Sequence, residues 1–184
     1  MTNKNKKGFT IIEVVLVLAI AGLIFLMVFI ALPALQRSQR NTQREDDLAR
    51  IITAVNQYQA NNNGKVPFGR DGGEIGNFVK RYVDSTCSYA SSAFTCSSNE
   101  FRDPQGNNYN MVDMGLANKT GEGALTFGDG GADVSSAIAK EGTFYGYAYA
   151  SCGDEGKIIK GTGNRDVAVF MKLEGGAIAC NDNH

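Results

Sequence analysis

Histidine is almost absent from this chain of 184 residues: the one histidine is His184, and there is no tryptophan. A catalytic triad or a Cys–His pair needs an imidazole that moves a proton, and multi-histidine metal sites need several imidazoles. The composition argues against these classes of enzyme and metal site. We therefore expect a protein that is not an enzyme and that has no cofactor.

An excess of positive charge is also missing. The chain has 18 Lys and Arg against 19 Asp and Glu, and three of the lysines, Lys4, Lys6 and Lys7, lie near its start. A nucleic acid gains little long-range attraction from such a balance. Because hydrophobic residues make up 43% of the chain, the composition also excludes a long disordered protein.

Ionisable side chains are missing from Val14 to Leu35. A helix over this range is about 33 Å long, which is enough to cross a hydrocarbon core of about 30 Å. The lysines ahead of it place the start of the chain in the cytoplasm, so the polar sequence that follows should lie outside. The segment predicts a membrane-spanning helix.

Three interpretations of this segment differ in how they treat Glu13. A cleaved secretory signal has a shorter apolar core, of about 7–15 residues. A plain uncleaved anchor leaves Glu13 unexplained, since a carboxylate deep in a bilayer costs roughly 2.5–3.5 kcal/mol. No Lys or Arg lies between Lys7 and Arg37. A partner for Glu13 should therefore come from another chain or from a chain end.

The residues from Lys6 to Glu13, KKGFTIIE, carry a resemblance to a known family. A short basic leader ends in Gly8, Phe9 follows, Glu13 stands at the fifth position after the glycine, and a long apolar stretch continues. This pattern resembles the class III signal of type IV prepilins. The resemblance implies that residues 1–8 are a leader, that prepilin peptidase cuts between Gly8 and Phe9, and that Phe9 is then N-methylated.

The resemblance also implies how such a chain is used. Glu13 of one subunit would pair with the Phe9 ammonium of its neighbour, and identical subunits would form a helical filament with the help of an inner-membrane assembly platform. The protein would lie in the cytoplasmic membrane before assembly and at the cell surface afterwards. The expected function is that of a type IV pilus subunit, in adhesion, twitching motility or DNA uptake. Two alternatives stay open: a pseudopilin of a type II secretion or competence apparatus, and a membrane-anchored binding domain that never polymerises.

The expected fold is α+β and similar to that of pilins. A long N-terminal helix covers residues 9–62, and its transmembrane half covers about 9–35. Gly22 and Pro33 mark where this helix should kink or loosen. An apolar stripe at steps of three and four follows between Leu48 and Tyr58. The globular head covers residues 63–184.

Within the head we expect a short helix over 75–82, another over 133–140, and strands over 109–114, 143–150, 166–173 and 177–180. The strands should form an antiparallel sheet covered by the apolar stripe of the long helix. Arg37, Arg40 and Arg44 form a basic stripe. It is either a solvated helix face or a surface for charge pairing between subunits.

Four cysteines, Cys87, Cys96, Cys152 and Cys180, lie in the part expected to be outside. An even number in an exported head favours disulfides, and three pairings are possible. We favour the sequential pairing, in which Cys87–Cys96 closes a local loop. Cys152–Cys180 would link the last strands covalently, as C-terminal disulfides do in many pilins. A zinc site is the alternative, although the chain has no Cys-x-x-Cys.

A glycine-rich loop holds one weak metal candidate. Asp129 and Asp133 stand four residues apart and could bind calcium, as loops in some related pseudopilins do. The loop lacks the ligand spacing of an EF-hand. A turn followed by a helix cap is the simpler interpretation, so we expect no metal.

Overall fold

The computed structural model describes residues 8–69, 73–90, 93–97, 101–116 and 140–184. The expected helix over 133–140 and the calcium candidates Asp129 and Asp133 lie outside these ranges, apart from Lys140 at the helix end. The described chain divides into two compact units, one ending at Gln39 and one running from Arg40 to His184. Each is taken here by itself.

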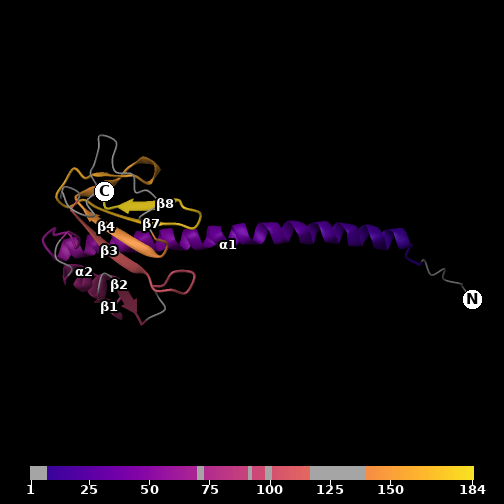
Figure 1. Cartoon of the computed structure of the whole chain (residues 1–184), viewed down its shortest axis with the longest axis horizontal. Helices are drawn as coiled ribbons and strands as arrows, with labels where there is room; N and C mark the ends of the chain where they lie inside the picture. The colour runs from indigo at the N-terminus through magenta and orange to yellow at the C-terminus, as the bar shows by residue number, and fades with distance from the viewer. Residues whose placement is uncertain (1–7, 70–72, 91–92, 98–100, 117–139) are drawn as a thin grey trace, which may run out of the picture. The chain divides into compact units, whose positions relative to one another are not determined.

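The first unit is the N-terminal part of α1 (Ile11–Asn61), the long helix of Figure 1. Its sequence is apolar on every face, and nothing in the described chain buries it. The helix runs through Gly22 and Pro33 without interruption, so a kink at these positions stays a prediction. Among the described residues α1 is the one helix long and apolar enough to cross a membrane.

The second unit begins with the rest of α1, which ends as expected at its run of asparagines. The Gly64 N–H donates to the Gln59 carbonyl at 2.8 Å, and Asn63 and Gly64 adopt positive φ angles of 55° and 77°. This is the left-handed backbone that closes helix C-termini. A short helix, α2 (Gly73–Phe78), and a π-helical turn, η1 (Val79–Val83), follow where a helix over 75–82 was expected.

A four-stranded sheet forms the centre of the head, with the strand order β3-β4-β7-β8. Its strands are β3 (Asn110–Leu116), β4 (Thr143–Ala148), β7 (Val167–Lys172) and β8 (Ile178–Asp182). The α+β class is confirmed. The sheet is mixed rather than purely antiparallel, because β3 pairs with β4 in parallel while the other two pairs are antiparallel.

Two short hairpins flank this sheet, and the sequence analysis predicted neither. One joins β1 (Cys87–Ala90) to β2 (Ala93–Cys96), and the other joins β5 (Ala150–Cys152) to β6 (Ile158–Lys160). The expected strand 143–150 is broken at Tyr149, which has a φ of 60° and turns the chain from β4 into β5. A strand cannot continue through such a residue.

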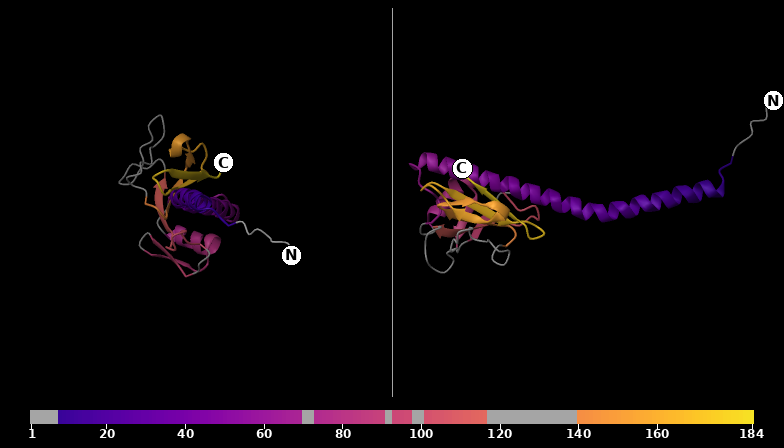
Figure 2. Two further views of the ribbon diagram at one scale, coloured as in Figure 1. Left: turned by 90° about the vertical axis from the view of Figure 1, so that its right-hand side faces the viewer. Right: turned by 90° about the horizontal axis from the view of Figure 1, so that it is seen from above.

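Alternating side chains bury both faces of the sheet. In β7, Val167, Val169 and Met171 pack in one cluster with Leu48, Ile51 and Val55 of α1. Ala168 and Phe170 point the other way, into a second cluster with Tyr145, Tyr147 and Ile158. The apolar stripe of α1 therefore covers one face, as predicted, and Figure 2 shows the strands lying along this part of the helix.

Candidate functional site

The expected processing segment lies immediately ahead of α1. Gly8, Phe9 and Thr10 are exposed and not helical, and the helix begins at Ile11. The Phe9 side chain is 91% exposed. The Gly8–Phe9 peptide bond thus lies in accessible, irregular backbone, which is the kind of segment that proteases cut.

Thr10 and Glu13 form a capping box at the start of α1. The Thr10 backbone N–H and hydroxyl both donate to Glu13 Oε2 at 2.8 Å, and the Glu13 N–H donates to Thr10 Oγ1 at 3.4 Å. This reciprocal arrangement satisfies main-chain donors that the first helical turn leaves unpaired. The helix therefore starts at a defined residue, Ile11, which is the third residue after the expected cleavage bond.

The capping box gives Glu13 a partner within its own chain, which we did not predict. The Thr10 N–H and hydroxyl donate to Oε2. A charged partner from another chain or a chain end stays a prediction. Thr-x-x-Glu before an apolar run is the sequence pattern typical of such a box.

Large apolar side chains cover the surface of the N-terminal unit. From Ile11 to Leu35 they are between 44 and 85% exposed. Water tolerates a continuous apolar surface of this kind poorly, at about 25 cal/mol for each Å². This part of α1 needs a bilayer or other helices around it.

A network of charged residues ties α1 to the head. Arg40 donates from Nε and Nη2 to the two carboxylate oxygens of Glu174, at 2.6 and 2.7 Å. One turn later Arg44 donates to both oxygens of Asp103 at 2.7 and 3.1 Å, and to Glu174 at 3.2 Å. The hydrogen bonds from Arg40 lower the pKa of Glu174 to about 2.

Two further contacts extend this network along α1. The Asn41 side-chain amide donates to the Glu174 carbonyl at 3.1 Å and accepts from the Glu174 N–H at 3.0 Å. The Tyr109 hydroxyl donates to Asp47 Oδ2 at 2.8 Å, and burial is the main reason that the pKa of Asp47 is raised. Glu174 follows β7, in the turn that leads to β8, so the helix is fixed to that hairpin by paired side chains.

The basic stripe of the sequence analysis is therefore only partly exposed. Arg37 is exposed, but Arg44 is 1% exposed and Arg40 is half-buried. The expectation of a solvated face is wrong for Arg44, which is buried, and both Arg40 and Arg44 pair within the chain. Charge pairing between subunits stays a prediction. The partners within the chain, Asp103 and Glu174, are more than 50 residues away in sequence, so no local pattern showed them.

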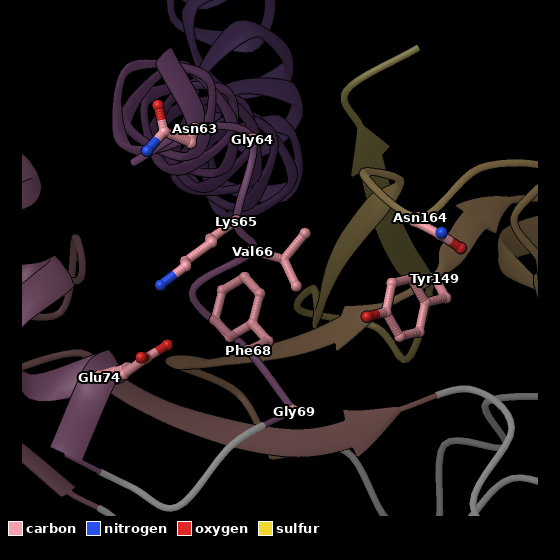
Figure 3. A pocket seen from close by; sticks show the side chains of 9 residues that line it. All are labelled: Asn63, Gly64, Lys65, Val66, Phe68, Gly69, Glu74, Tyr149 and Asn164. Atoms are coloured by element: carbon pink, nitrogen blue, oxygen red, sulfur yellow. The ribbon is translucent and has the colours of Figure 1, made fainter. Parts of the chain in front are cut away.

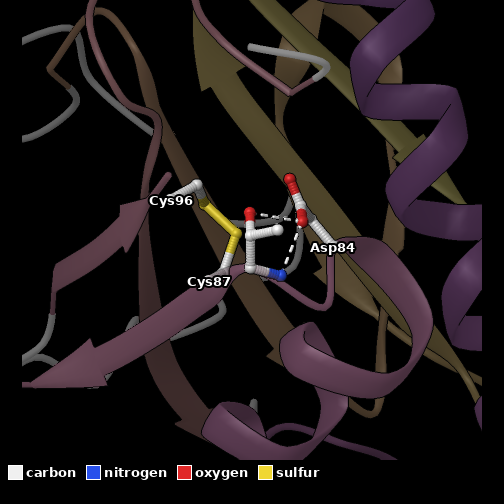
Figure 4. Close-up of a disulfide and its surroundings, with 4 residues drawn as sticks. Asp84, Cys87 and Cys96 are labelled. Carbon is white, nitrogen blue, oxygen red and sulfur yellow. Dashed lines mark hydrogen bonds between the residues drawn. A yellow bond between two sulfur atoms is a disulfide. The ribbon is translucent and has the colours of Figure 1, made fainter. Parts of the chain in front are cut away.

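The cysteines lie in two disulfides, Cys87–Cys96 and Cys152–Cys180, which is the sequential pattern that we favoured. Asp84 has a carboxylate oxygen near Cys87 and Cys96, as Figure 4 shows. A disulfide leaves no thiolate to bind a metal, and Asp84 accepts hydrogen bonds from the N–H and hydroxyl of Thr86. This cluster does not have the character of a metal site.

A pocket of about 400 Å³ opens where α1 ends. Figure 3 shows Lys65 and Glu74 on one side of it and Tyr149 and Asn164 on the other. One Glu74 oxygen is buried and has no hydrogen-bond partner among the described residues. The pocket holds no hydroxyl or thiol paired with a base, so its geometry does not indicate catalysis.

Ser151 and His184 meet near the end of the chain, although we expected no pairing of a nucleophile with a base. Ser151 Oγ lies 2.7 Å from His184 Nε2, and Asp166 Oδ2 lies 3.4 Å from the same nitrogen. In a hydrolytic triad the carboxylate holds the other ring nitrogen. Here the Ser151 hydroxyl and the Asp166 carboxylate both lie at Nε2, and Ser151 is buried. The contact therefore fits a structural role, in which it holds His184 against β5, better than a catalytic one.

Comparison with protein-family models shows that residues 3–29 match the prokaryotic N-terminal methylation motif. The match includes the Gly8–Phe9 bond, the capping box and the first part of α1. No curated protein and no solved structure matches the chain.

Proposed function

Because the chain carries the N-terminal methylation motif of prepilin-type proteins, the class III signal of type IV pilins, we propose that it is a structural subunit of a type IV pilus. The observation that carries the proposal is the motif together with the exposed apolar half of α1 that follows it. In this proposal prepilin peptidase cuts after Gly8, Phe9 becomes the methylated N-terminus, and the apolar half of α1 moves from the bilayer into the core of a filament.

Glu13 would set the register between neighbouring subunits. Its Oε2 accepts from Thr10 within the chain, which leaves Oε1 to accept from the Phe9 ammonium of a neighbour. A buried ion pair is tolerated when the remaining lone pairs of its carboxylate accept hydrogen bonds, and the Thr10 N–H and hydroxyl donate those bonds here. The same box keeps Phe9 outside the helix, where its ammonium can reach a second chain.

The head would form the outer part of the filament. Its two disulfides suit an oxidising environment outside the cytoplasm. The paired charges at Arg40, Arg44 and Glu174 hold the C-terminal part of α1 on the head. A pseudopilin of a type II secretion or competence apparatus is the alternative, because it would carry the same motif.

Gly8→Val tests the proposal, because a branched side chain at the position before the cut should block a peptidase pocket shaped for glycine. The protein recovered from membranes and from sheared cell-surface material is analysed by intact mass and N-terminal residue. We expect wild type to begin at methylated Phe9 in the sheared fraction. We expect Gly8→Val to keep its leader and to stay in the membrane.

Gly22→Ala is the matched control, since a Cβ at Gly22 meets nothing within 4 Å. It should be cleaved after Gly8 and methylated at Phe9 like wild type, so it controls for processing. Surface filaments of normal amount from Gly8→Val would contradict the proposal and favour a simple membrane anchor.

A further inference from the structure

The two disulfides of the head differ in their surroundings. Cys87 and Cys96 pair directly across the β1–β2 hairpin and are each 3% exposed, within the main core. Cys152 of β5 and Cys180 of β8 are half-buried and link two separate sheets. Thiol–disulfide exchange depends on access of the attacking sulfur, so this difference bears on reactivity.

An open groove of about 410 Å³ leads to Cys152–Cys180. Both cysteines line it, together with Glu45 and Leu48 of α1. Gly153 and Gly156 also line the groove. A small thiol or an extended peptide segment has room in a space of this size.

Among the described residues, the hollow next to Cys96 is much smaller. It measures about 10 Å³ and is lined by core residues such as Val79, Phe101 and Met111. A single water needs at least about 10–15 Å³. An attacking thiol is larger than water, so this hollow gives it no room next to Cys96 in the folded protein.

We propose that Cys152–Cys180 is a thiol-exchange site of the folded protein, and that its reaction partner is a dithiol. A thiolate of the partner attacks the sulfur of one cysteine. A mixed disulfide forms, the bond between the two cysteines breaks, and its electron pair leaves on the other sulfur, which takes a proton from water. The second thiolate of the partner then attacks the partner's own sulfur in the mixed disulfide. This forms the partner's internal disulfide and releases the protein's cysteine that was attacked first, which also takes up a proton. The protein gains two electrons as two thiols, and the dithiol loses them as an internal disulfide.

The contacts around the site predict what its reduction would change. The disulfide ties the β5–β6 hairpin to β8, and the Cys152 N–H also donates to Asp182 Oδ2 at 2.7 Å. This hydrogen bond and the contact of Ser151 with His184 do not involve sulfur, so reduction of the disulfide does not remove them directly. The α1-facing core does not include Cys152 or Cys180. Reduction should therefore loosen the β5–β6 hairpin and leave α1 and β7 in place.

The test uses the full-length chain in detergent micelles. Dithiothreitol is added for increasing times, free thiols are trapped with N-ethylmaleimide, and each cysteine is quantified by peptide mass spectrometry. We expect Cys152 and Cys180 to be labelled at least tenfold faster than Cys87 and Cys96 in the folded protein. In guanidinium the two rates should converge, because unfolding removes the difference in access. A ratio below ten in the folded protein overturns the proposal, as does a map that shows other pairings.

Hydrogen exchange on the selectively reduced protein tests the structural consequence independently. We expect amide protection in Ala150–Lys160 to fall by at least tenfold and protection in Val167–Lys172 to stay within twofold of the oxidised protein. Unchanged protection in Ala150–Lys160 would show that the disulfide does not hold the hairpin, and protection lost in both segments would show that the site is not local. The proposal does not rest on filament assembly, since both measurements use the unassembled chain.

Discussion

Arg44 of α1 donates from Nε and Nη2 to the two carboxylate oxygens of Asp103, and the two side chains are only 1 and 3% exposed. The pair joins the helix to a segment 59 residues away, beside the start of β3. Asp103 also accepts from the Gln105 N–H, and Arg44 reaches Glu174. A buried charge that loses its partner is strongly destabilising, because nothing then offsets the cost of taking the remaining charge out of water.

Arg44→Met should destabilise the head by about 3–5 kcal/mol, since it leaves Asp103 buried without its guanidinium. The measurement is urea unfolding of the full-length chain in detergent, followed by near-UV circular dichroism. Arg37→Met is the matched control, because Arg37 is exposed and on the same helix, and its effect should stay within about 0.5 kcal/mol. A loss below about 1 kcal/mol for Arg44→Met would show that the pair does not hold the helix on the head.

Glu174 should make the head sensitive to acid. Its folded pKa of about 2 lies below the value of about 4.3 of an unpaired Glu. A carboxyl whose pKa is depressed by folding stabilises the protein above its unfolded pKa, and this contribution is lost as pH falls from about 5 to about 2. Glu174→Gln should therefore cost about 1–2 kcal/mol at pH 7 and almost nothing near pH 2, after allowance for solvent screening of a site at the surface.

Wild type and Glu174→Gln are compared at each pH, because Asp47 is present in both proteins and its contribution cancels. The raised pKa of Asp47 changes the free energy of unfolding with pH in the opposite direction to Glu174. Glu45→Gln is the control, because Glu45 is exposed on α1, and its effect on the free energy of unfolding should stay within about 0.5 kcal/mol. A constant difference between wild type and Glu174→Gln from pH 7 to pH 2 would contradict the role assigned to the Arg40 pair.

Thr10→Ala should loosen the first turn of α1. It removes the hydroxyl that accepts the Glu13 N–H and donates to Oε2, at a cost of about 1 kcal/mol for a lost helix cap. We expect the Glu13 amide to exchange about fivefold faster in micelles, measured by NMR. Thr10→Ser keeps a hydroxyl at the same place and should exchange like wild type. Equal rates for all three proteins would mean that the capping box does not form in a bilayer-like medium.

Glu13→Val separates a polymerising subunit from a simple anchor. Without Glu13 the Phe9 ammonium of a neighbour would be buried alone, a penalty of roughly 3–5 kcal/mol. At about 1.4 kcal/mol per tenfold, incorporation should fall by two orders of magnitude or more, while membrane insertion is normal or better. Glu13→Asp should be intermediate, because the charge remains on a shorter arm. Immunoblots of the sheared and membrane fractions compare the amount of assembled protein with the amount left in the membrane. If Glu13→Val assembles as well as wild type, Glu13 is an interfacial carboxylate that does not set the register between subunits.

Local features of this protein could be predicted from its sequence, and distant pairings could not. The end of α1 at Asn61 and the stripe from Leu48 to Tyr58 both depend on residues within a few positions of one another. The break at Tyr149 was missed because a tyrosine gives no sign of a positive φ. The parallel pairing of β3 with β4 was missed because strand direction depends on how a long connection returns.

The sequence by itself determined the processing signal, the apolar half of α1 and the class of the head, because spacing and hydrophobic pattern fix these through local chemistry. Only the tertiary structure decided which charges are buried and paired. Arg37, Arg40 and Arg44 look alike in the sequence, yet only the latter two meet Glu174 and Asp103. It also decided which disulfide faces a groove, because access to a sulfur depends on the elements packed around it.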